Sequence, residues 1–424
     1  MKFIVKPSKV SGSIDIPGSK SHTIRALVLG LLAEGESVIR APLESSDTRS
    51  CMEMVKKFGA EIVEEKNLWR VKGTGGTPVV PYDVIDTGNS GTSMYFGLGI
   101  ASLVNGYSIF TGDYQTRNRP VYALLKSIAD LKGTAFSTRG NNKLPVVIKG
   151  KIKGGITSVE AQTSQYLSSL LIAAPLASGD TTIQTALLNE RPYVEMTLAW
   201  LNKLGIKYTN KEFKNFFFSG GQKYKAFIEH IPADFSSAAF FLVAASITGS
   251  ELVLNGLDFF DSQGDKEIVN ILRAMGSEIE SRGASLRIKG EKLKGGVFDL
   301  NLIPDALPCL AIAGCFAEGE TRLINVAQAR LKETDRIKVM AGELKKMGAD
   351  IEEMPDGLVI RRSTLKGTEV SGHDDHRIVM ALSVAGLASD GQTEIDTAQS
   401  ASVTFPGFFD LMKSINAGIE KVEE

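Results

Sequence analysis

The stretch Ala317-Glu318-Gly319-Glu320-Thr321 belongs to a short pattern that occurs six times along the chain and indicates how it folds. The pattern is a small or aliphatic residue, any residue, Gly, and then Ser or Thr within two positions. The other copies are Ala33-Glu34-Gly35-Glu36-Ser37, Val104-Asn105-Gly106-Tyr107-Ser108, Ala177-Ser178-Gly179-Asp180-Thr181, Ile247-Thr248-Gly249-Ser250 and Ser389-Asp390-Gly391-Gln392-Thr393. Subtracting positions, successive glycines are 71, 73, 70, 70 and 72 residues apart. Unrelated loops would not keep this spacing, so the sequence predicts one structural unit repeated six times.

Each copy predicts the same order of elements. An apolar helix such as 238–247 precedes the Gly, which suits a helix C-cap, and a short alternating strand such as 321–324 follows. The second helix is amphipathic, and in the fifth copy its apolar face is made of Ile337, Met340, Leu344 and Met347. Glu343 falls on the opposite, solvated side of that helix. With the strands after it, the unit is predicted to be βαβαββ.

The first helix of each copy is apolar nearly all round, as in 170–174, so it is expected to be buried, with the second helix at the surface. Six units of about 70 residues are then expected to form an α/β protein of two domains with three units each. The expected N-terminal domain spans 14–226, and the expected C-terminal domain combines 1–13 with 227–424. A doubly wound sheet with repeating turn chemistry is the alternative.

The composition narrows the class of partner. The chain has 424 residues with 48 Lys and Arg against 49 Asp and Glu, which disfavours a nucleic-acid or membrane-surface binder. No apolar run approaches the roughly 20 residues that span a bilayer, and no signal-peptide pattern follows Met1, so a cytoplasmic protein is expected. The three cysteines, Cys51, Cys309 and Cys315, lack paired ligand spacing and are expected to be buried thiols.

Polar residues gather where the six buried helices are expected to begin. These starts read Pro17-Gly18-Ser19-Lys20-Ser21-His22, Thr87-Gly88-Asn89-Ser90-Gly91-Thr92, Gln162-Thr163-Ser164-Gln165, Asp234-Phe235-Ser236-Ser237, Pro304-Asp305 and His373-Asp374-Asp375-His376-Arg377. For a single helix such residues are ordinary N-caps. In six equivalent helices they would also aim free N–H groups and positive dipole ends at one region, which suits an anion.

Cations cluster near the same starts and in the loops before the second helices. They are Lys20, Arg25, Arg117, Arg119, Arg330, Lys332, Arg336 and Arg377. Arginine binds carboxylates and phosphates in a bidentate way, although an isolated surface cation is the simpler explanation for any one of them. Glu333 and Asp305 add carboxylates that can carry protons, and His376 is either a neutral donor or a cap. The sequence contains no dinucleotide, P-loop, zinc or serine-nucleophile pattern.

These residues resemble the enolpyruvyl transferase family, and within it the enzymes that act on shikimate 3-phosphate. The motifs that match occur in the family's order over nearly the whole chain: Pro17-Gly18-Ser19-Lys20-Ser21 with Arg25, Gly88-Asn89-Ser90-Gly91-Thr92, Arg119-Pro120, Ser164-Gln165, Pro304-Asp305, Lys332-Glu333-Thr334-Asp335-Arg336, Asp375-His376-Arg377 and Thr404-Phe405-Pro406. The resemblance implies a two-domain inside-out α/β barrel of six βαβαββ units, with a substrate cleft between domains that close on the substrates. It implies transfer of the enolpyruvyl group of phosphoenolpyruvate to the 5-hydroxyl of shikimate 3-phosphate, through a tetrahedral intermediate that releases phosphate.

The resemblance also implies residue roles. The catalytic residues would be Asp305, Glu333 and Lys20. Phosphoenolpyruvate would be held by Lys20, Asn89, Gly91, Arg119, Gln165, Arg336 and Arg377. Shikimate 3-phosphate would be held by Lys20, Ser21, Arg25, Thr163, Ser164, Gln165, Tyr193, Asp305, Gln328 and Lys332, with His376 as a further candidate. No metal, organic cofactor, nucleic acid or membrane partner is implied, and the chain is expected to act as a monomer.

The chain departs from the family pattern at four positions. They are Tyr95 and Val403, where the family commonly has Arg and Lys, Gln328, where Asn is frequent, and Ile24, where Asn or His is usual. Losing two cations would weaken phosphoenolpyruvate binding unless Arg117 or Arg330 compensates.

Two alternative functions stay open. An enzyme of the same fold transfers enolpyruvyl to a UDP-amino-sugar, but the loop from Arg117 to Pro120 lacks the Cys that such a relative usually carries. A catalytically silent, anion-binding homologue would fit the changes at Tyr95 and Val403.

Overall fold

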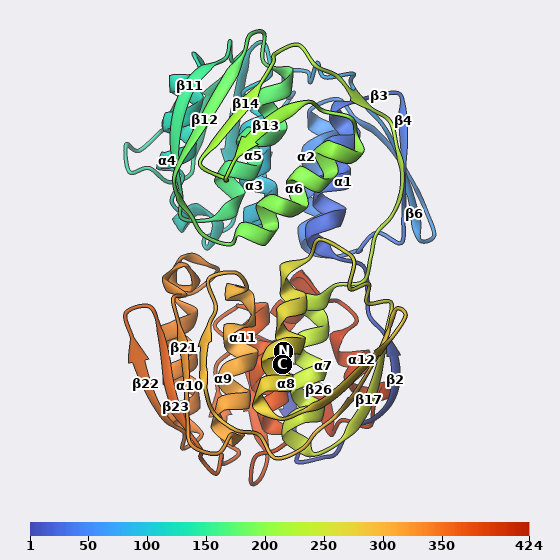
Figure 1. Ribbon diagram of the computed structural model, residues 1–424, viewed down its shortest axis with the longest axis vertical. Helices are drawn as coiled ribbons and strands as arrows, with labels where there is room; N and C mark the ends of the chain where they lie inside the picture. The colour runs from blue at the N-terminus through green and yellow to red at the C-terminus, as the bar shows by residue number, and fades with distance from the viewer. Residues whose placement is uncertain (424) are drawn as a thin grey trace. The chain divides into compact units, whose positions relative to one another are not determined.

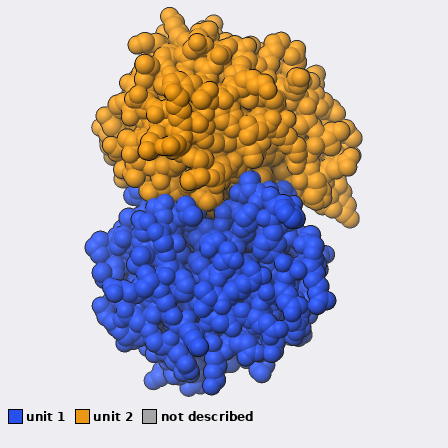
Figure 2. Space-filling view, in the orientation of Figure 1, with its two compact units in different colours: residues 1–17, 232–424 blue, residues 18–231 orange. Residues whose placement is uncertain are grey.

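The structure, a computed structural model, describes residues 1–423 and divides into two compact units (Figure 2). The continuous unit is Gly18–Ile231, and the split unit combines Met1–Pro17 with Pro232–Glu424. Each unit has a hydrophobic core of its own. Within residues 1–423, no helix combines the length and the apolar character that crossing a membrane requires.

The described part of the continuous unit contains three four-stranded sheets, ordered β16-β4-β6-β5, β7-β8-β10-β9 and β11-β12-β14-β13, and one two-stranded sheet, β15-β3 (Figure 1). Its strands are β3 (Ala33–Glu34), β4 (Glu36–Arg40), β5 (Glu61–Glu65), β6 (Leu68–Lys72), β7 (Ile85–Asp86), β8 (Tyr107–Thr111), β9 (Thr134–Ser137), β10 (Val146–Lys149), β11 (Gly155–Ala161), β12 (Thr181–Leu188), β13 (Tyr208–Lys211), β14 (Asn215–Phe218), β15 (Tyr224–Lys225) and β16 (Ile228–His230). Its α-helices are α1 (Lys20–Leu32), α2 (Ser46–Lys57), α3 (Gly91–Ala101), α4 (Tyr122–Asp130), α5 (Ser164–Ala173) and α6 (Arg191–Lys203).

The split unit, as far as residue 423, also contains three four-stranded sheets, ordered β18-β19-β17-β2, β20-β21-β23-β22 and β24-β25-β1-β26. Its strands are β1 (Lys2–Val5), β2 (Ser11–Asp15), β17 (Glu251–Asn255), β18 (Glu278–Arg282), β19 (Ser285–Lys289), β20 (Val297–Asp299), β21 (Glu320–Ile324), β22 (Asp350–Met354), β23 (Gly357–Arg361), β24 (Glu369–Val370), β25 (Thr393–Ile395) and β26 (Ile419–Val422). Its α-helices are α7 (Phe235–Thr248), α8 (Glu267–Met275), α9 (Leu307–Phe316), α10 (Arg336–Lys346), α11 (His376–Gly386) and α12 (Phe408–Ser414).

The six four-stranded sheets of the described chain confirm the repeated βαβαββ unit. The fifth copy runs β20, α9, β21, α10, β22, β23. Strands β20 and β21 pair in parallel across the α9 crossover, with Phe298 opposite Leu323, and β23 lies antiparallel between β21 and β22. A parallel pair needs such a crossover, whereas the antiparallel pair β22–β23 needs only a tight turn.

Three copies are completed by strands from elsewhere in the chain. Strand β2 precedes α1 in sequence but pairs in parallel with β17 of the fourth copy. Strand β16 precedes α7 but pairs in parallel with β4 of the first copy. Strand β1 lies antiparallel to both β25 and β26 and closes the sheet of the sixth copy.

Burial separates the two kinds of helix as predicted. The inner helices α1, α3, α5, α7, α9 and α11 are buried almost all round, whereas α2, α4, α6, α8 and α10 each bury one face (Figure 1). Cys51, Cys309 and Cys315 are buried free thiols, as expected. The predicted glycine C-cap holds only for Gly249, which caps α7 at φ 60°; in the other copies the equivalent Gly lies beyond the helix end.

Candidate active site

Side chains cap five of the six inner helices in the described chain. Ser19, Ser90, Thr163, Asp234 and Asp375 each accept a hydrogen bond from a backbone N–H two or three residues further on. Helix α9 is the exception, since no side chain caps it and the short 3₁₀ helix Pro304–Ala306 leads into it. The carboxylate of Asp305 therefore does not cap its own helix. It pairs with cations instead.

Arg336, the first residue of α10, is the centre of the polar cluster in the split unit. Its side chain is 1% exposed, and its Nε and Nη2 donate to the two carboxylate oxygens of Asp375 at 2.8 and 3.1 Å. Its Nη1 donates to Asp305 at 2.8 Å, and its Nη2 also donates to Glu333. Burial opposes its charge, but Asp375, Glu333 and Asp305 outweigh this and raise the pKa of Arg336 above its ordinary value.

Asp305 also contacts two further cations, Arg377 and Lys332. Arg377 lies 3.3 Å from its carboxylate and donates to its backbone carbonyl at 3.2 Å, and the Lys332 Nζ lies at 3.6 Å. Burial alone would favour the neutral acid. Arg377, Lys332 and Arg336 outweigh burial and hold the pKa of Asp305 well below its ordinary value. Asp305 is therefore ionised at neutral pH, and Ser236 at the start of α7 accepts from Arg377 at 2.7 Å.

The turn before α11 carries unusual backbone. His373 and Asp374 have φ values of 53° and 55°, a left-handed conformation that costs L-residues about 1 kcal/mol or more each. The side chain of Glu343 accepts from His373 Nε2 at 2.8 Å and from the Ser371 N–H at 3.0 Å. Glu343 is thus buried, so the prediction that it faces solvent is wrong: it holds the turn that delivers Asp375 to Arg336.

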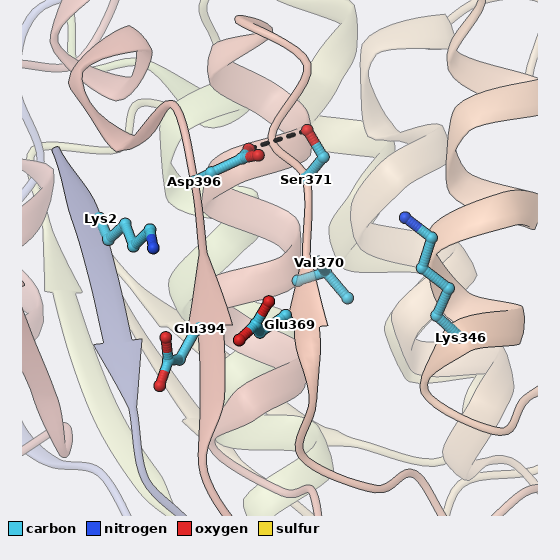
Figure 3. A pocket seen from close by; sticks show the side chains of 7 residues that line it. All are labelled: Lys2, Lys346, Glu369, Val370, Ser371, Glu394 and Asp396. Atoms are coloured by element: carbon cyan, nitrogen blue, oxygen red, sulfur yellow. Dashed lines mark hydrogen bonds between the residues drawn. The ribbon is translucent and has the colours of Figure 1, made fainter.

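A pocket of about 260 Å³ lies beside this turn in the split unit (Figure 3). It is lined by Lys2, Lys346, Glu369, Val370, Ser371, Glu394 and Asp396. Asp396 accepts from the Ser371 hydroxyl and from the Gly372 N–H, both at 2.8 Å, so its side chain supports the same turn. The residues predicted from the sequence to bind substrate are not among those that line this pocket.

Two further predicted residues of the split unit are enclosed. Gln328 is 4% exposed and donates to the Asn301 carbonyl at 3.1 Å. His376 is 2% exposed, with its Nδ1 3.9 Å from Asp375. Both side chains are therefore buried.

In the continuous unit, Lys20 at the start of α1 pairs with Asp47 at 2.9 Å, and both side chains are largely buried. Asp47 lies in the first turn of α2, where an acid also complements the helix dipole. The Lys20 ammonium group therefore lies next to a carboxylate.

Arg119 lies directly over the first residue of α3. A Cβ added at Gly91 would meet Arg119 Nη1 at 2.1 Å, so the glycine is required for the guanidinium to approach the helix. The hydroxyls of Tyr95 and Tyr166 both donate to the carbonyl of Pro120, at 3.0 and 2.6 Å, and their rings pack edge to face. Tyr95 therefore supports the backbone next to Arg119.

Asn89 and Gln165 connect the inner helices to their surroundings. Asn89 donates to Asp113 at 2.6 Å and to Gln115 at 2.5 Å. Gln165 of α5 donates to Thr92 of α3 at 2.9 Å, so the N-termini of these two helices lie together. The structure thus brings Gly91, Arg119 and Gln165 into one neighbourhood of the continuous unit.

Arg25 is enclosed to a degree that the sequence did not indicate. It is 2% exposed, and its nitrogens donate to Thr197 and to the carbonyls of Ser21 and Tyr193 at 2.9 to 3.0 Å. Burial lowers the pKa of Arg25 to about 10. Its contacts hold the backbone of Ser21 and Tyr193, two residues that the family resemblance links to shikimate 3-phosphate.

Three acids that contact the predicted site residues were not assigned a role from the sequence. They are Asp47, Glu190 and Asp375. Glu190 accepts from the hydroxyls of Thr163 and Ser164, at 3.1 and 2.9 Å. Asp47 and Asp375 look like ordinary helix-start acids in the sequence. Their partners lie 27 and 39 residues away along the chain, which no local signal reveals.

Comparison with known proteins identifies the family to which the chain belongs. The sequence profile described as EPSP synthase (3-phosphoshikimate 1-carboxyvinyltransferase) matches residues 4–412. A 3-phosphoshikimate 1-carboxyvinyltransferase of Acetivibrio thermocellus is 54% identical over all of both chains, and one of Ruminiclostridium cellulolyticum is 56% identical over 99% of each. The EPSP synthase structure from Acinetobacter baumannii superposes with a TM-score of 0.84 over all of both chains, at 29% identity. Since these matches extend over nearly every repeat, the chain belongs to the EPSP synthase (3-phosphoshikimate 1-carboxyvinyltransferase) family.

Proposed function

We propose that this chain transfers the enolpyruvyl group of phosphoenolpyruvate to the 5-hydroxyl of shikimate 3-phosphate and releases inorganic phosphate, a step of the shikimate pathway. The observation that carries the proposal is the convergence of Lys332, Arg336 and Arg377 on Asp305. Both substrates are polyanions, so bringing them together costs Coulomb repulsion that such cations offset.

Four cations are proposed to hold the phosphate and carboxylate of phosphoenolpyruvate, as the resemblance implies. They are Lys20, Arg119, Arg336 and Arg377. Gly91 admits the Arg119 guanidinium to the start of α3, where backbone N–H groups also favour an anion.

Asp305 is proposed as the base. Addition requires that the 5-hydroxyl loses its proton while the methylene carbon of phosphoenolpyruvate gains one. The cations around Asp305 keep it ionised, so it can accept a proton, but the same cations weaken it as a base. Substrate anions that engage these cations would raise the pKa of Asp305 and let it accept the hydroxyl proton. Glu333 and Lys20 are then left to deliver and later remove the proton on carbon.

The remaining predicted residues are proposed to orient shikimate 3-phosphate. Thr163, Ser164 and Gln165 present hydroxyl, amide and backbone donors at the start of α5, while Arg25 fixes Ser21 and Tyr193. We further propose that the chain acts as a monomer; sedimentation velocity measures this directly.

One assay tests the function. Phosphate release from phosphoenolpyruvate is followed with shikimate 3-phosphate and, separately, with a UDP-amino-sugar as acceptor. Release with shikimate 3-phosphate alone is expected. Release with the UDP-amino-sugar alone would assign the chain to the other transferase reaction, and binding without release would leave an anion-binding protein.

A further inference from the structure

Glu190 occupies a position that local preferences disfavour. It precedes α6 with φ 56° and ψ 39°, a left-handed conformation in which a non-glycine residue is uncommon. Its side chain does not cap α6, and Ser, Thr, Asp or Asn would be the usual residue there. A residue that breaks such local preferences is expected to have a role elsewhere in the fold.

The side chain reaches the start of α5 instead. Its carboxylate oxygen Oε2 accepts from the Thr163 hydroxyl at 3.1 Å, the Ser164 hydroxyl at 2.9 Å and the Ser164 N–H at 3.1 Å. Glu190 is 2% exposed. A single buried carboxylate oxygen therefore takes three donors at a helix N-terminus, the arrangement in which proteins bind an anion.

These donors are the ones proposed above for shikimate 3-phosphate. A Ser or Thr hydroxyl has one proton, and a backbone N–H has one, so neither can donate fully to Glu190 and to a phosphate oxygen together. The Thr163 hydroxyl oxygen is engaged as well, since it accepts from the Gln165 N–H at 3.4 Å.

We propose that Glu190 is an internal competitor for the substrate phosphate. In the free protein its carboxylate occupies the donors of Thr163 and Ser164, and it turns away when the phosphate group of shikimate 3-phosphate takes its place. Glu190 thereby sets the affinity for this substrate below what the donors alone would give. The proposal rests on the proposed function for the identity of the phosphate ligand.

A gain of affinity on removing the carboxylate is the distinctive consequence. Glu190→Gln keeps the size of the side chain but replaces the charged acceptor with a neutral one. Glu190→Ser removes the reach to α5 and adds a donor of its own. A hydrogen bond to a charged group is worth enough to change binding by about tenfold or more, so the dissociation constant for shikimate 3-phosphate is expected to fall by about tenfold in each variant.

Glu195→Gln provides the matched control. Glu195 lies one turn further along α6, half exposed and paired with Arg191 at 2.9 Å, so the variant makes the same change of charge without touching α5. Calorimetry measures binding of shikimate 3-phosphate and of inorganic phosphate to wild type and all three variants. Steady-state phosphate release gives KM for each substrate.

The expected result is tighter binding of both anions and a lower KM for shikimate 3-phosphate in the two Glu190 variants only, with KM for phosphoenolpyruvate unchanged. Equal or weaker binding in folded Glu190 variants overturns the proposal. A crystal structure of the wild-type complex with shikimate 3-phosphate tests it without any variant: the Glu190–Ser164 hydrogen bond is expected to be broken, and its retention overturns the proposal. Absence of wild-type turnover with shikimate 3-phosphate would instead reject the proposed function, and inorganic phosphate would still test Glu190.

Discussion

Gly91→Ala offers a direct test of how Arg119 is placed. The glycine is the first residue of α3, and the guanidinium of Arg119 lies against the space where a side chain would begin. An added Cβ would meet Nη1 at 2.1 Å and Cζ at 2.6 Å, far inside ordinary van der Waals contact. Because the guanidinium is the end of a flexible side chain, it is expected to move while the helix stays.

The size of the effect follows from the distance. Ordinary contact begins at 3.4 Å, so Nη1 must retreat by 3.4 minus 2.1, or about 1.3 Å. A misplacement of about 1 Å in a positioning group can cost up to about 10²-fold. KM for phosphoenolpyruvate is therefore expected to rise about 10- to 100-fold, which corresponds to about 1.4 to 2.7 kcal/mol.

The assay is phosphate release at varied phosphoenolpyruvate and saturating shikimate 3-phosphate. Gly342→Ala in α10 is the matched control, since a Cβ there meets no atom within 4 Å. The control should keep both KM values and gain about 0.5–1 kcal/mol of stability from its better helix propensity. An unchanged KM for phosphoenolpyruvate in folded Gly91→Ala would refute the placement of Arg119 at this anion site.

Four further predictions concern single side chains of the candidate active site. Glu333→Gln is expected to lower kcat by about 10²-fold or more while calorimetry finds both substrates still bound, and wild-type kcat would remove Glu333 from proton transfer. Arg119→Ala should raise KM for phosphoenolpyruvate and spare that for shikimate 3-phosphate; equal changes in both would contradict its assignment. Tyr95→Phe leaves the Pro120 carbonyl with one phenol donor and should cost about 1 kcal/mol in urea unfolding, an interpretation that fails if stability is unchanged. The depressed pKa of Asp305 means that its ion pairs stabilise the fold above the ordinary carboxyl pKa of about 3.9 and lose this contribution as the pH falls towards the folded-state pKa. The melting-temperature gap between wild type and Asp305→Asn should accordingly be widest near about pH 7 and narrow below about pH 4, and a constant gap would contradict this.

Local signals in the sequence were sufficient for the repeat and for most of the elements. The apolar helices before Gly179 and Gly319 and the amphipathic face of Ile337 and Met340 depend on periodicities of a few residues, and the structure confirms them. The polar helix starts were likewise visible, and five of the six inner helices in the described chain are capped by side chains from them. Such features are encoded by neighbouring residues, so sequence spacing alone is informative.

The same local signals did not reveal contacts between residues that are far apart in the sequence. Glu343 reads as a solvated helix residue, yet the turn at His373 covers it. Glu190 was not assigned a role from the sequence, yet it is buried against Ser164, 26 residues away along the chain. Periodicity shows which face of a helix is apolar but not which loop folds over the other face.

Local sequence patterns therefore define the βαβαββ unit, its six copies and the residue types at the helix starts. Which strand completes each sheet depends on the packing of the chain, since β2 pairs with a copy far after it in sequence and β16 with a copy far before it. The same packing determines which acid meets which cation, as in the contacts of Arg336 with Asp305 and Asp375. The reason is physical: hydrogen bonds within a unit are set by local spacing, whereas ion pairs and strand exchange depend on how the units pack, and many pairings are compatible with one local pattern.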